Sequence, residues 1–459
     1  PPPLEKLSAP SREKVLIIGS GPAGLFAALR LTERGIPVHI FEQGSPCHER
    51  LLKINKFWRS GQLDPYNNVC FGEGGAGLYS DGKLITRIKS PYIPYVLGRL
   101  VEFGAPEEIL YLANPHVGSD RIRRLIPHIR KRIEAQGGHF HFNSPVTKIL
   151  IGPHNQVQGL QVQNHKTFYS PFVILACGHS AEPLFQHLRQ IGVFIEGKSF
   201  AVGLRIEHPR THIDTIQYGS YASQLETANY KLSYHDHKTN IGVYSFCMCP
   251  GGYVLSSGTE PDGVVCNGMS NYNRNAPYSN AALVVTVDRQ RFSFPFEGLL
   301  WRKYLEKSGF LAVQRAGGHK ELPAQTLTDF LSQKLSQTDL KGSSPSGLKS
   351  APLHDLLPPD IYRGLCRGIE NFSHKMRGFE QKAILYGMET RTSCPIRITR
   401  HKDSLQSVSH PGLYPCGEGA GYAGGITSAA CDGIKVAEAI FKQLCSQSTY
   451  KDSSATSTT

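Results

Sequence analysis

One stretch, residues 15–42, constrains the fold of this chain more than any other. It opens with the apolar run Val15–Ile18, which is typical of a buried parallel strand. The hexapeptide Gly19-Ser20-Gly21-Pro22-Ala23-Gly24 follows and fits the pattern G-x-G-x-x-G. A helix pattern and a second apolar run come next, and Glu42 closes that run. This order of strand, glycines, helix, strand and acid predicts a βαβ unit that binds an adenine dinucleotide.

Each residue of the pattern has a physical role in holding such a ligand. Gly19 allows the tight turn, Gly21 lets the backbone approach a pyrophosphate, and Gly24 lets the helix pack on the strand. The helix directs unpaired N–H groups and its positive dipole end at the phosphates. Glu42 follows at close to the spacing of about 20 residues expected for an acid that binds the ribose hydroxyls. A glycine-rich turn without a ligand is the alternative, and the presence of all five parts disfavours it.

The composition sets limits on the class of protein. At 459 residues the chain is long enough for two or three domains. Lys and Arg number 50 and Asp and Glu 37, which gives a net charge of +13. This excess suits nucleic acid, a membrane surface or anionic substrates, and does not decide among them. Eleven scattered cysteines do not make a disulfide framework and indicate a reducing compartment. No apolar run approaches the roughly 18 residues that a membrane-spanning helix needs.

A second glycine-rich stretch, Phe71–Lys83, also matches G-x-G-x-x-G. No strand pattern precedes it, and Asp81-Gly82 would break a following helix. We therefore expect a loop whose backbone wraps a flat ligand closely, with a plain flexible loop as the alternative. Arg50, ahead of this loop, is a candidate phosphate ligand. The candidate contacts in this part of the chain are Gln43, Arg50, Gly74, Gly75, Ala76, Ser80 and Asp81.

Two later apolar runs end in small residues. Phe172–Leu175 leads into Ala176-Cys177-Gly178, and a strand returning here to the first sheet would bring this backbone close to the dinucleotide. Near the C-terminal end, Gly412–Ile426 contains a third fingerprint, followed by a helix pattern over about 427–444. Too little chain remains for a complete βαβ unit of about 30 residues, so this turn must complete a sheet begun earlier. The candidate contacts in these segments are Val146, Ala176, Gly178, Gly417, Glu418, Gly424, Gly425 and Ile426.

Two fingerprints at opposite ends of the chain, with an Ala-x-Gly strand between them, resemble the glutathione-reductase-type FAD fold. The motifs also look like those of the poorly characterised FAD-dependent dehydrogenases, often called NAD(FAD)-utilising dehydrogenases, of bacteria and plastid-bearing organisms. The segments that carry this narrower resemblance are Phe71–Lys83, Phe246–Tyr253, Glu389–Ser393 and Gly417–Ile426. The resemblance implies bound FAD and oxidoreductase activity, and it supplies neither a substrate nor catalytic residues.

The resemblance also implies an architecture. We expect an α/β protein with a Rossmann-like FAD-binding domain over 12–198 and 379–445. A mixed α+β substrate domain would be inserted over 199–378, where the sequence changes to scattered short strands and many turns. The polar ends, 1–11 and 446–459, are expected to be disordered.

Within that fold, the resemblance gives each turn a role. The first turn would hold the ADP half, and Gly417-Glu418 would hold the ribityl chain and the inner phosphate. A helix that starts near Ile426 would direct its N–H groups at the N1–C2=O edge of the flavin and stabilise negative charge there.

Several other motifs favour structural interpretations. Cys247-x-Cys249 and His235-x-His237 invite a metal or redox reading, but neither has a second pair nearby, so a strand and a polar turn are favoured and no metal site is predicted. Arg391 could hold an anionic group or form a structural ion pair. The basic face of a predicted helix over 120–136 is favoured as a solvated face over a nucleic-acid contact.

Several functions therefore remain open. A small organic substrate would exchange electrons with FAD, and NAD(P)H could visit as a transient donor, since no second complete βαβ fingerprint offers it a permanent site. An unidentified electron carrier is the other partner class. A flavin-dependent RNA-modifying enzyme and a non-catalytic FAD-binding protein are the alternatives. The first residue is Pro, which indicates a processed or cropped N-terminus. We expect a soluble protein of the cytoplasm or a plastid stroma.

Overall fold

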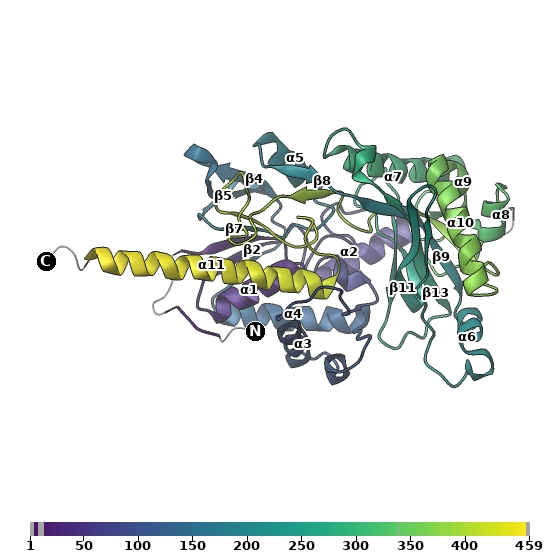
Figure 1. The fold of residues 1–459 in the computed structure, drawn as a ribbon, viewed down its shortest axis with the longest axis horizontal. Coiled ribbons are helices and arrows are strands. Elements are labelled where there is room, and N and C mark those ends of the chain that lie inside the picture. The colour runs from purple at the N-terminus through teal and green to yellow at the C-terminus, as the bar shows by residue number, and fades with distance from the viewer. Residues whose placement is uncertain (1–3, 8–12, 338, 456–459) are drawn as a thin grey trace.

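The computed structural model describes residues 4–7, 13–337 and 339–455. The chain forms two domains that lie side by side, each built on its own sheet (Figure 1). The first sheet has five parallel strands in the order β18-β7-β1-β2-β3. Its members are β1 (Val15–Ile18), β2 (Val38–Phe41), β3 (His139–His141), β7 (Val173–Leu175) and β18 (Leu413–Pro415).

The predicted βαβ unit is confirmed. The helix between its strands is α1 (Pro22–Glu33), and β1 pairs in parallel with β2, with Val15 opposite Val38. The strand order also confirms the two predicted returns, because β7 lies beside β1 and β18 lies beside β7. Since all five strands are parallel, the segments that follow them meet at one edge of the sheet, where open α/β sheets bind their ligands.

Helices cover one face of this sheet and a small second sheet covers the other. On the helical face, α1 packs along α11 so closely that a Cβ on Gly433 would lie 2.1 Å from the Ala23 carbonyl oxygen. The opposite face of β1, with Leu16 and Ile18, packs with the antiparallel β4–β5–β6 sheet. The elements of these two layers are α3 (Ile93–Glu102), α4 (Ser119–Ala135), α5 (Glu182–Gln190), α11 (Ile426–Ala455), β4 (Val146–Ile151), β5 (Val157–Val162) and β6 (Thr167–Tyr169).

The second domain is built on an eight-stranded, largely antiparallel sheet. Its long central strands are β9 (Phe200–Pro209), β11 (Ile241–Ser256) and β13 (Tyr278–Val287). Alternate residues of β9, such as Val202 and Leu204, pack in an apolar cluster with α10 (Pro359–Lys375). A separate two-stranded pair is formed by β8 (Ile195–Gly197) and β17 (Ile396–Ile398). The other elements of the second domain are α6 (Arg210–Tyr218), β10 (Ser233–Asp236), β12 (Cys266–Ser270), α7 (Glu297–Arg315), β14 (Leu322–Thr326), α8 (Leu327–Leu331), β15 (Leu348–Ser350), α9 (Leu353–Leu356) and β16 (Ile384–Glu389).

Two predicted boundaries are wrong. The second domain does not end at 378, because β16 pairs with β9 and β14 inside the second sheet. The segment 446–455 is helical, since α11 continues to Ala455, whereas residues 446–459 were expected to be disordered. No glycine or proline interrupts the chain from 434 to 455, and extending an existing helix needs no new nucleation. Residues 456–459 lie outside the described part.

Most of the N-terminal segment 1–11 also lies outside the described residues. Its described part, 4–7, is attached to the first domain, because the Leu7 N–H donates to the Arg34 carbonyl and Arg34 donates to the Glu5 carbonyl. Among the described helices, none combines the length and the apolar character needed to cross a membrane.

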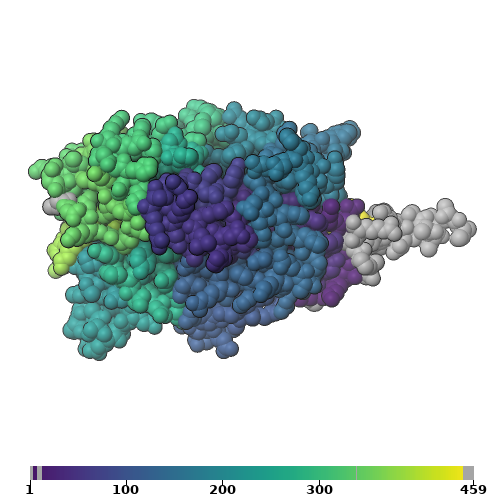
Figure 2. Space-filling view, turned by 180° about the vertical axis from the view of Figure 1, so that it is seen from behind, coloured from purple at the N-terminus to yellow at the C-terminus, as the bar shows by residue number. Residues whose placement is uncertain are grey.

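The segment after β2 lies across the junction of the two domains. It contains α2 (Cys47–Ser60), and Figure 2 shows this dark purple stretch between the green part of the second domain and the blue part of the first. The indole N–H of Trp58 donates to the Ser256 carbonyl across the junction at 2.9 Å. The loop that follows α2, with its glycines, is therefore placed where the two domains meet.

Candidate flavin site

Packing explains why the first turn carries glycine at two positions. Gly19 has a φ of +102°, and a Cβ there would lie 2.3 Å from the Ala176 carbonyl oxygen. A Cβ on Gly24 would lie 2.0 Å from the Gly19 carbonyl oxygen. The N–H groups of Ala23 and Gly24, at the start of α1, have no acceptor within the described chain. These N–H groups are thus available to the phosphates of a dinucleotide.

Glu42 joins the first turn to the glycine loop. Its buried carboxylate accepts hydrogen bonds from the Ser20 N–H and hydroxyl, at 3.1 and 2.7 Å. The N–H groups of Gly44 and Gly72 also donate to it, each at 3.0 Å. These four donors occupy the roughly four lone-pair sites of a carboxylate. A ribose hydroxyl can therefore bind Glu42 only by replacing a donor, and the rotatable Ser20 hydroxyl can be replaced without moving the backbone.

Arg50 holds the glycine loop rather than a phosphate. Its side chain is fully buried, and its guanidinium donates only to loop carbonyls at 2.8–3.3 Å. The acceptors are the carbonyls of Asn68, Val69, Gly72, Glu73 and Gly75. No N–H of Arg50 is left for a ligand in this arrangement, whereas the sequence predicted a phosphate ligand at this residue. The sequence could not show this because every acceptor is a backbone group.

The glycine loop packs directly on the first turn. The Gly74 N–H donates to the Ser20 carbonyl at 3.0 Å, and a Cβ on Gly75 would lie 3.0 Å from the Gly21 Cα. Ala76 follows as the first residue of a short 3-10 helix, Ala76–Tyr79. The loop therefore wraps closely against another backbone, and the glycines are what permit the contact.

Ser80 and Asp81 close this loop and attach it to the second domain. The Ser80 hydroxyl donates to the Gly77 carbonyl and accepts from the Gly82 N–H. The Asp81 carboxylate is 1% exposed and accepts from two nitrogens of Arg274, at 3.0 and 2.5 Å. Both side chains thus have structural partners beside the proposed cofactor.

Two other predicted contacts have different surroundings. Gln43 is half-buried, directly after Glu42, and its side chain makes no hydrogen bond within the described residues. Val146 begins β4, opposite Val162, and packs against the apolar cluster on the β4–β5–β6 side.

The last turn lies against the segment that follows β7. A Cβ on Gly419 would lie 2.2 Å from the Gly178 carbonyl oxygen. The Gly417 N–H donates to Asp432 at 2.8 Å, and Arg400 pairs with Asp432 at 2.6 Å. The predicted Ala-x-Gly segment and the predicted Gly417 turn are therefore brought together.

Beside this contact there is open space. A Cβ added to Gly178, Gly424 or Gly425 would meet nothing within 4 Å. The N–H groups of Ile426 and Thr427, where α11 begins, have no acceptor in the described structure, whereas the backbone of Gly425 hydrogen-bonds to the Glu418 carboxyl. Open space next to unpaired N–H groups fits a flat, negatively charged group, and so fits the flavin end of FAD.

Glu418 carries a perturbed carboxyl group in the same turn. Burial raises its pKa to about 7, with nearby Cys247 adding to the rise and Lys198 opposing it. Burial also lowers the pKa of Lys198. Sequence reasoning assigned Glu418 to cofactor binding and missed this property, because the groups that perturb it come from distant segments.

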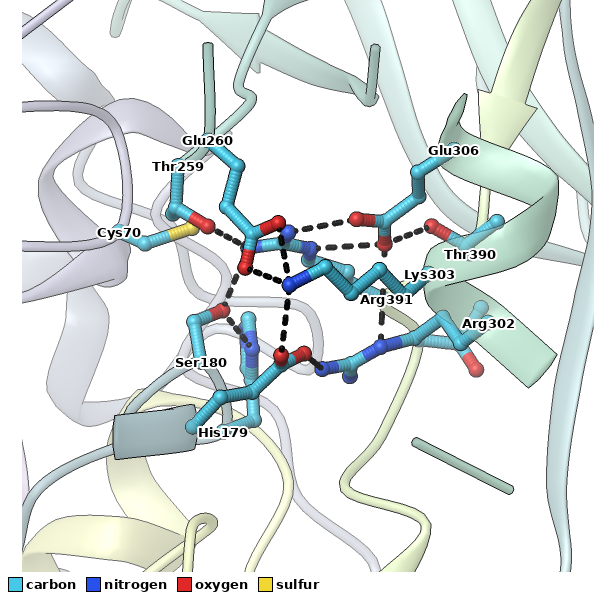
Figure 3. Close-up of polar contacts among 12 residues, drawn as sticks. Cys70, His179, Ser180, Thr259, Glu260, Arg302, Lys303, Glu306, Thr390 and Arg391 are labelled. Carbon is cyan, nitrogen blue, oxygen red and sulfur yellow. Dashed lines mark hydrogen bonds and ion pairs between the residues drawn. The ribbon is translucent and has the colours of Figure 1, made fainter. Parts of the chain in front are cut away.

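A buried cluster of charges lies near Gly178, at the junction of the domains (Figure 3). Arg391 donates to both carboxylate oxygens of Glu306, at 3.0 and 2.7 Å, and to the hydroxyls of Ser180 and Thr259, each at 2.9 Å. Burial and the nearby Arg302 and Arg391 lower the pKa of His179 to about 3, so this ring is neutral. The sequence left open an anion-binding and a structural role for Arg391, and this pairing favours the structural one.

The basic face of α4 is largely engaged within the protein. Arg130 pairs with Glu73 at 2.8 Å and Arg132 with Glu102 at 2.7 Å, while Arg121 lies over the Tyr272 ring. These contacts leave few free cations for nucleic acid. Within the described chain, no three His, Cys, Asp or Glu side chains are grouped so that they could hold a metal ion.

Comparisons with known proteins point to the same cofactor. A family model described as FAD binding domain matches residues 14–68, and one described as FAD-dependent protein, C-terminal domain-like, matches residues 199–392. An uncharacterized protein of Clostridium beijerinckii is 42% identical over 440 residues, which cover 94% of this chain and 81% of that protein. FAD is therefore the cofactor of this fold.

Solved structures resemble the chain only weakly. L-proline dehydrogenase from P. horikoshii is 12% identical, with 95% of each chain covered and a TM-score of 0.38. The flavin-dependent brominase Bmp2 is 13% identical, with 95% of this chain and 79% of that chain covered and a TM-score of 0.41. Neither likeness indicates a substrate for this chain.

Proposed function

The chain belongs to the family of FAD-dependent proteins that share this C-terminal domain, and on that premise we propose that it is a dehydrogenase or reductase. It moves a hydride or an electron pair between a small organic substrate and tightly bound FAD. One observation carries the proposal: the segments after β1, β7 and β18 converge at one sheet edge, beside open space and the starts of two helices.

Different segments of the chain have different roles around the cofactor. When bound, FAD supplies the hydride and electron chemistry. The N–H groups at the start of α1 hold phosphate, and those of Ile426 and Thr427 stabilise negative charge on the flavin end. Glu418, whose pKa is raised to about 7, is suited to hold or release a proton beside that turn near neutral pH.

NAD(P)H suits this site only as a visiting donor. The described part of the second domain is built on a largely antiparallel sheet and offers no second phosphate-binding βαβ turn. A nicotinamide donor would therefore have to enter the junction between the domains and leave after delivering its electrons.

An anaerobic reduction assay tests the proposal. The purified protein is mixed with NADH, NADPH or pooled small metabolites, and the yellow flavin absorbance is followed. We expect at least one donor to bleach the flavin. Bleaching by dithionite alone would favour the non-catalytic FAD-binding alternative and would contradict the proposal.

A matched pair of variants links the assay to the first turn. Gly21→Trp fills the space where the glycine loop approaches the turn, so the folded protein should lose its flavin. Gly98→Trp is the control, because a side chain at Gly98 meets nothing within 4 Å. A folded Gly21→Trp protein that stays fully yellow would show that FAD does not bind at this turn.

A further inference from the structure

Cys247 and Cys249 lie on a distorted part of β11. The pairing of β11 with β13 shifts register between Phe246 and Cys249, and again between Cys249 and Gly252. Cys247 has a φ of +46°, a conformation that non-glycine residues rarely adopt. Bulges of this kind re-aim side chains and are common beside active sites. The Cys249 thiol donates to the Cys247 carbonyl at 3.3 Å, so the two residues are folded back on each other.

A buried cation lies beside the pair. Arg205 is fully buried and donates to the Cys247 carbonyl at 3.3 Å and to Glu389 at 2.8 Å. Its Nη2 has no hydrogen-bond partner within the described residues. The Lys83 ammonium donates to the carbonyl of Met248, the residue between the two cysteines. Positive charge therefore approaches the pair from two segments.

The two thiols differ in acidity. The hydrogen bond from Cys249, together with Arg205 and Lys83, lowers the pKa of Cys247 to about 7. The same contact with Cys247 and burial raise the pKa of Cys249. Near neutral pH the Cys247 sulfur is partly ionised to the thiolate, while Cys249 remains a thiol. Thiol–disulfide chemistry needs this division, because the thiolate is the attacking group.

The pair lies next to the proposed flavin end of the site. Lys83 ends the glycine loop, and Cys247 is near enough to Glu418, in the last turn, to raise the pKa of that carboxyl. Cys247 is half-buried and Cys249 is buried. Cys247 thus keeps some exposed surface, whereas Cys249 is enclosed.

We propose that Cys247 and Cys249 are a redox-active pair that interconverts between a dithiol and an intramolecular disulfide and exchanges electrons with the bound flavin. The structure holds the dithiol form. On oxidation the S–S bond forms, and the Cys247 thiolate and the Cys249 thiol together lose one proton and two electrons. These pass to oxidised FAD, whose anionic fully reduced form holds them. The flavin exchange rests on the proposed function, whereas the dithiol–disulfide interconversion does not.

Equilibration with dithiothreitol tests the pair without using the flavin. The folded protein is equilibrated in mixtures of reduced and oxidised dithiothreitol, and free thiols are then alkylated. The mass of the peptide that contains both cysteines is measured by mass spectrometry. As the mixture becomes more oxidising, we expect the alkylation of Cys247 and Cys249 to be lost together, in one two-electron transition. Cys366→Ser, on α10, is the control and should behave as the wild type. A peptide that stays doubly alkylated in the most oxidising mixture would overturn the proposal.

Counting electrons tests the exchange with FAD. In an anaerobic dithionite titration, the disulfide form of the wild type should take up four electrons per FAD, two for each couple. Cys249→Ser and Cys247→Ser should take up two, and Cys366→Ser four. Two electrons in every protein would overturn the exchange. A protein that lacks FAD would instead contradict the proposed function, and the dithiothreitol transition would still be measurable.

Discussion

Glu42 has one predicted role and one observed role. The sequence predicts a ribose ligand at this position, and the structure shows that Glu42 joins the first turn to the glycine loop through Ser20 and Gly72. We therefore expect a substitution at Glu42 to change both the predicted ligand contact and the position of the loop.

We expect Glu42→Gln to weaken FAD binding by about 1–3 kcal/mol, the cost of losing a hydrogen bond to a charged group. An amide can accept only on its oxygen, so one N–H donor of the turn or loop loses its partner. The dissociation constant is measured from the fluorescence of released FAD. Glu49→Gln, at an exposed position on α2, is the control and should bind as the wild type. Equal affinity for the three proteins would show that Glu42 takes no part in binding.

Also at the scale of single residues, the lowered pKa of Cys247 predicts how its alkylation rate depends on pH. Only the thiolate reacts with iodoacetamide, so a pKa of about 7 should extend alkylation of Cys247 down to neutral pH. In Cys249→Ser the thiol donor is replaced by a hydroxyl, whereas Cys249→Ala removes it and should shift the profile toward the ordinary cysteine range. The alkylated peptide is quantified by mass spectrometry after brief exposure at each pH. Identical alkaline profiles in the wild type and Cys249→Ala would contradict the prediction.

At the scale of elements, the predicted role of the start of α11 can be tested by removing a single backbone N–H group. Proline is tolerated at the first position of a helix, because the N–H there has no helical partner. Ile426→Pro therefore removes one N–H from the open space while keeping the helix, and Ile426→Ala removes the same side-chain packing but retains the N–H.

We expect Ile426→Pro to keep FAD and to have a more negative flavin reduction potential than Ile426→Ala. Losing one donor to a charged group costs about 1–3 kcal/mol. Because 30 mV corresponds to about 1.4 kcal/mol for a two-electron couple, the difference should be tens of millivolts. A potentiometric titration measures it. The same midpoint in both variants, with FAD fully bound, would mean that this helix start does not act on the flavin.

The elements that the sequence predicted best are those whose signal is local. The strands β1 and β2 and the helix α1 follow from apolar runs and glycines within one short stretch. The return of β7 and β18 to the same sheet followed from the small residues after each strand and from the length of chain left. The membership of β16 in the second sheet was missed, because it depends on pairing with β9, far away in the sequence.

The candidate site was predicted in outline and missed in its polar detail. The turns converge as expected, but the partners of Arg50 are backbone carbonyls, and Arg391, in the loop after β16, pairs with Glu306 on α7. The pKa of Cys247 depends on the hydrogen bond from Cys249 and on Arg205, and the pKa of Glu418 depends on burial, Lys198 and Cys247. No pattern in a single sequence encodes such contacts, because they join backbone groups and side chains that become neighbours only in the folded chain.

For the whole molecule, an ion pair across the junction connects the two domains. The pair of Asp81 and Arg274 connects the glycine loop of the first domain to the second, and its carboxylate is almost fully buried. Removing Arg274 leaves the buried Asp81 carboxylate with only the Lys83 ammonium, 3.9 Å away, to compensate its charge.

Arg274→Ala should therefore lower the free energy of unfolding by about 3–5 kcal/mol, measured by urea denaturation of the protein without FAD. Asp81→Asn together with Arg274→Ala should be less destabilised than Arg274→Ala alone, because the neutral amide costs less to bury. Arg291→Ala, which breaks a more exposed pair with Asp360, is the control and should cost no more than about 1 kcal/mol. Equal effects of Arg274→Ala and Arg291→Ala would contradict the prediction.

The order of strands in the first sheet has a consequence for the protein as it is made on a ribosome. The strand β18 occupies an edge of that sheet, and the turn that follows it contributes the α11 end of the site. The turn after β1 is synthesised near the beginning, and the whole second domain emerges before β18 does. A nascent chain can thus assemble the phosphate end of the cavity before the second domain is made, but gains the last wall only after β18 and the start of α11 have emerged. We therefore expect a product truncated before β18 to lack the wall on the flavin side.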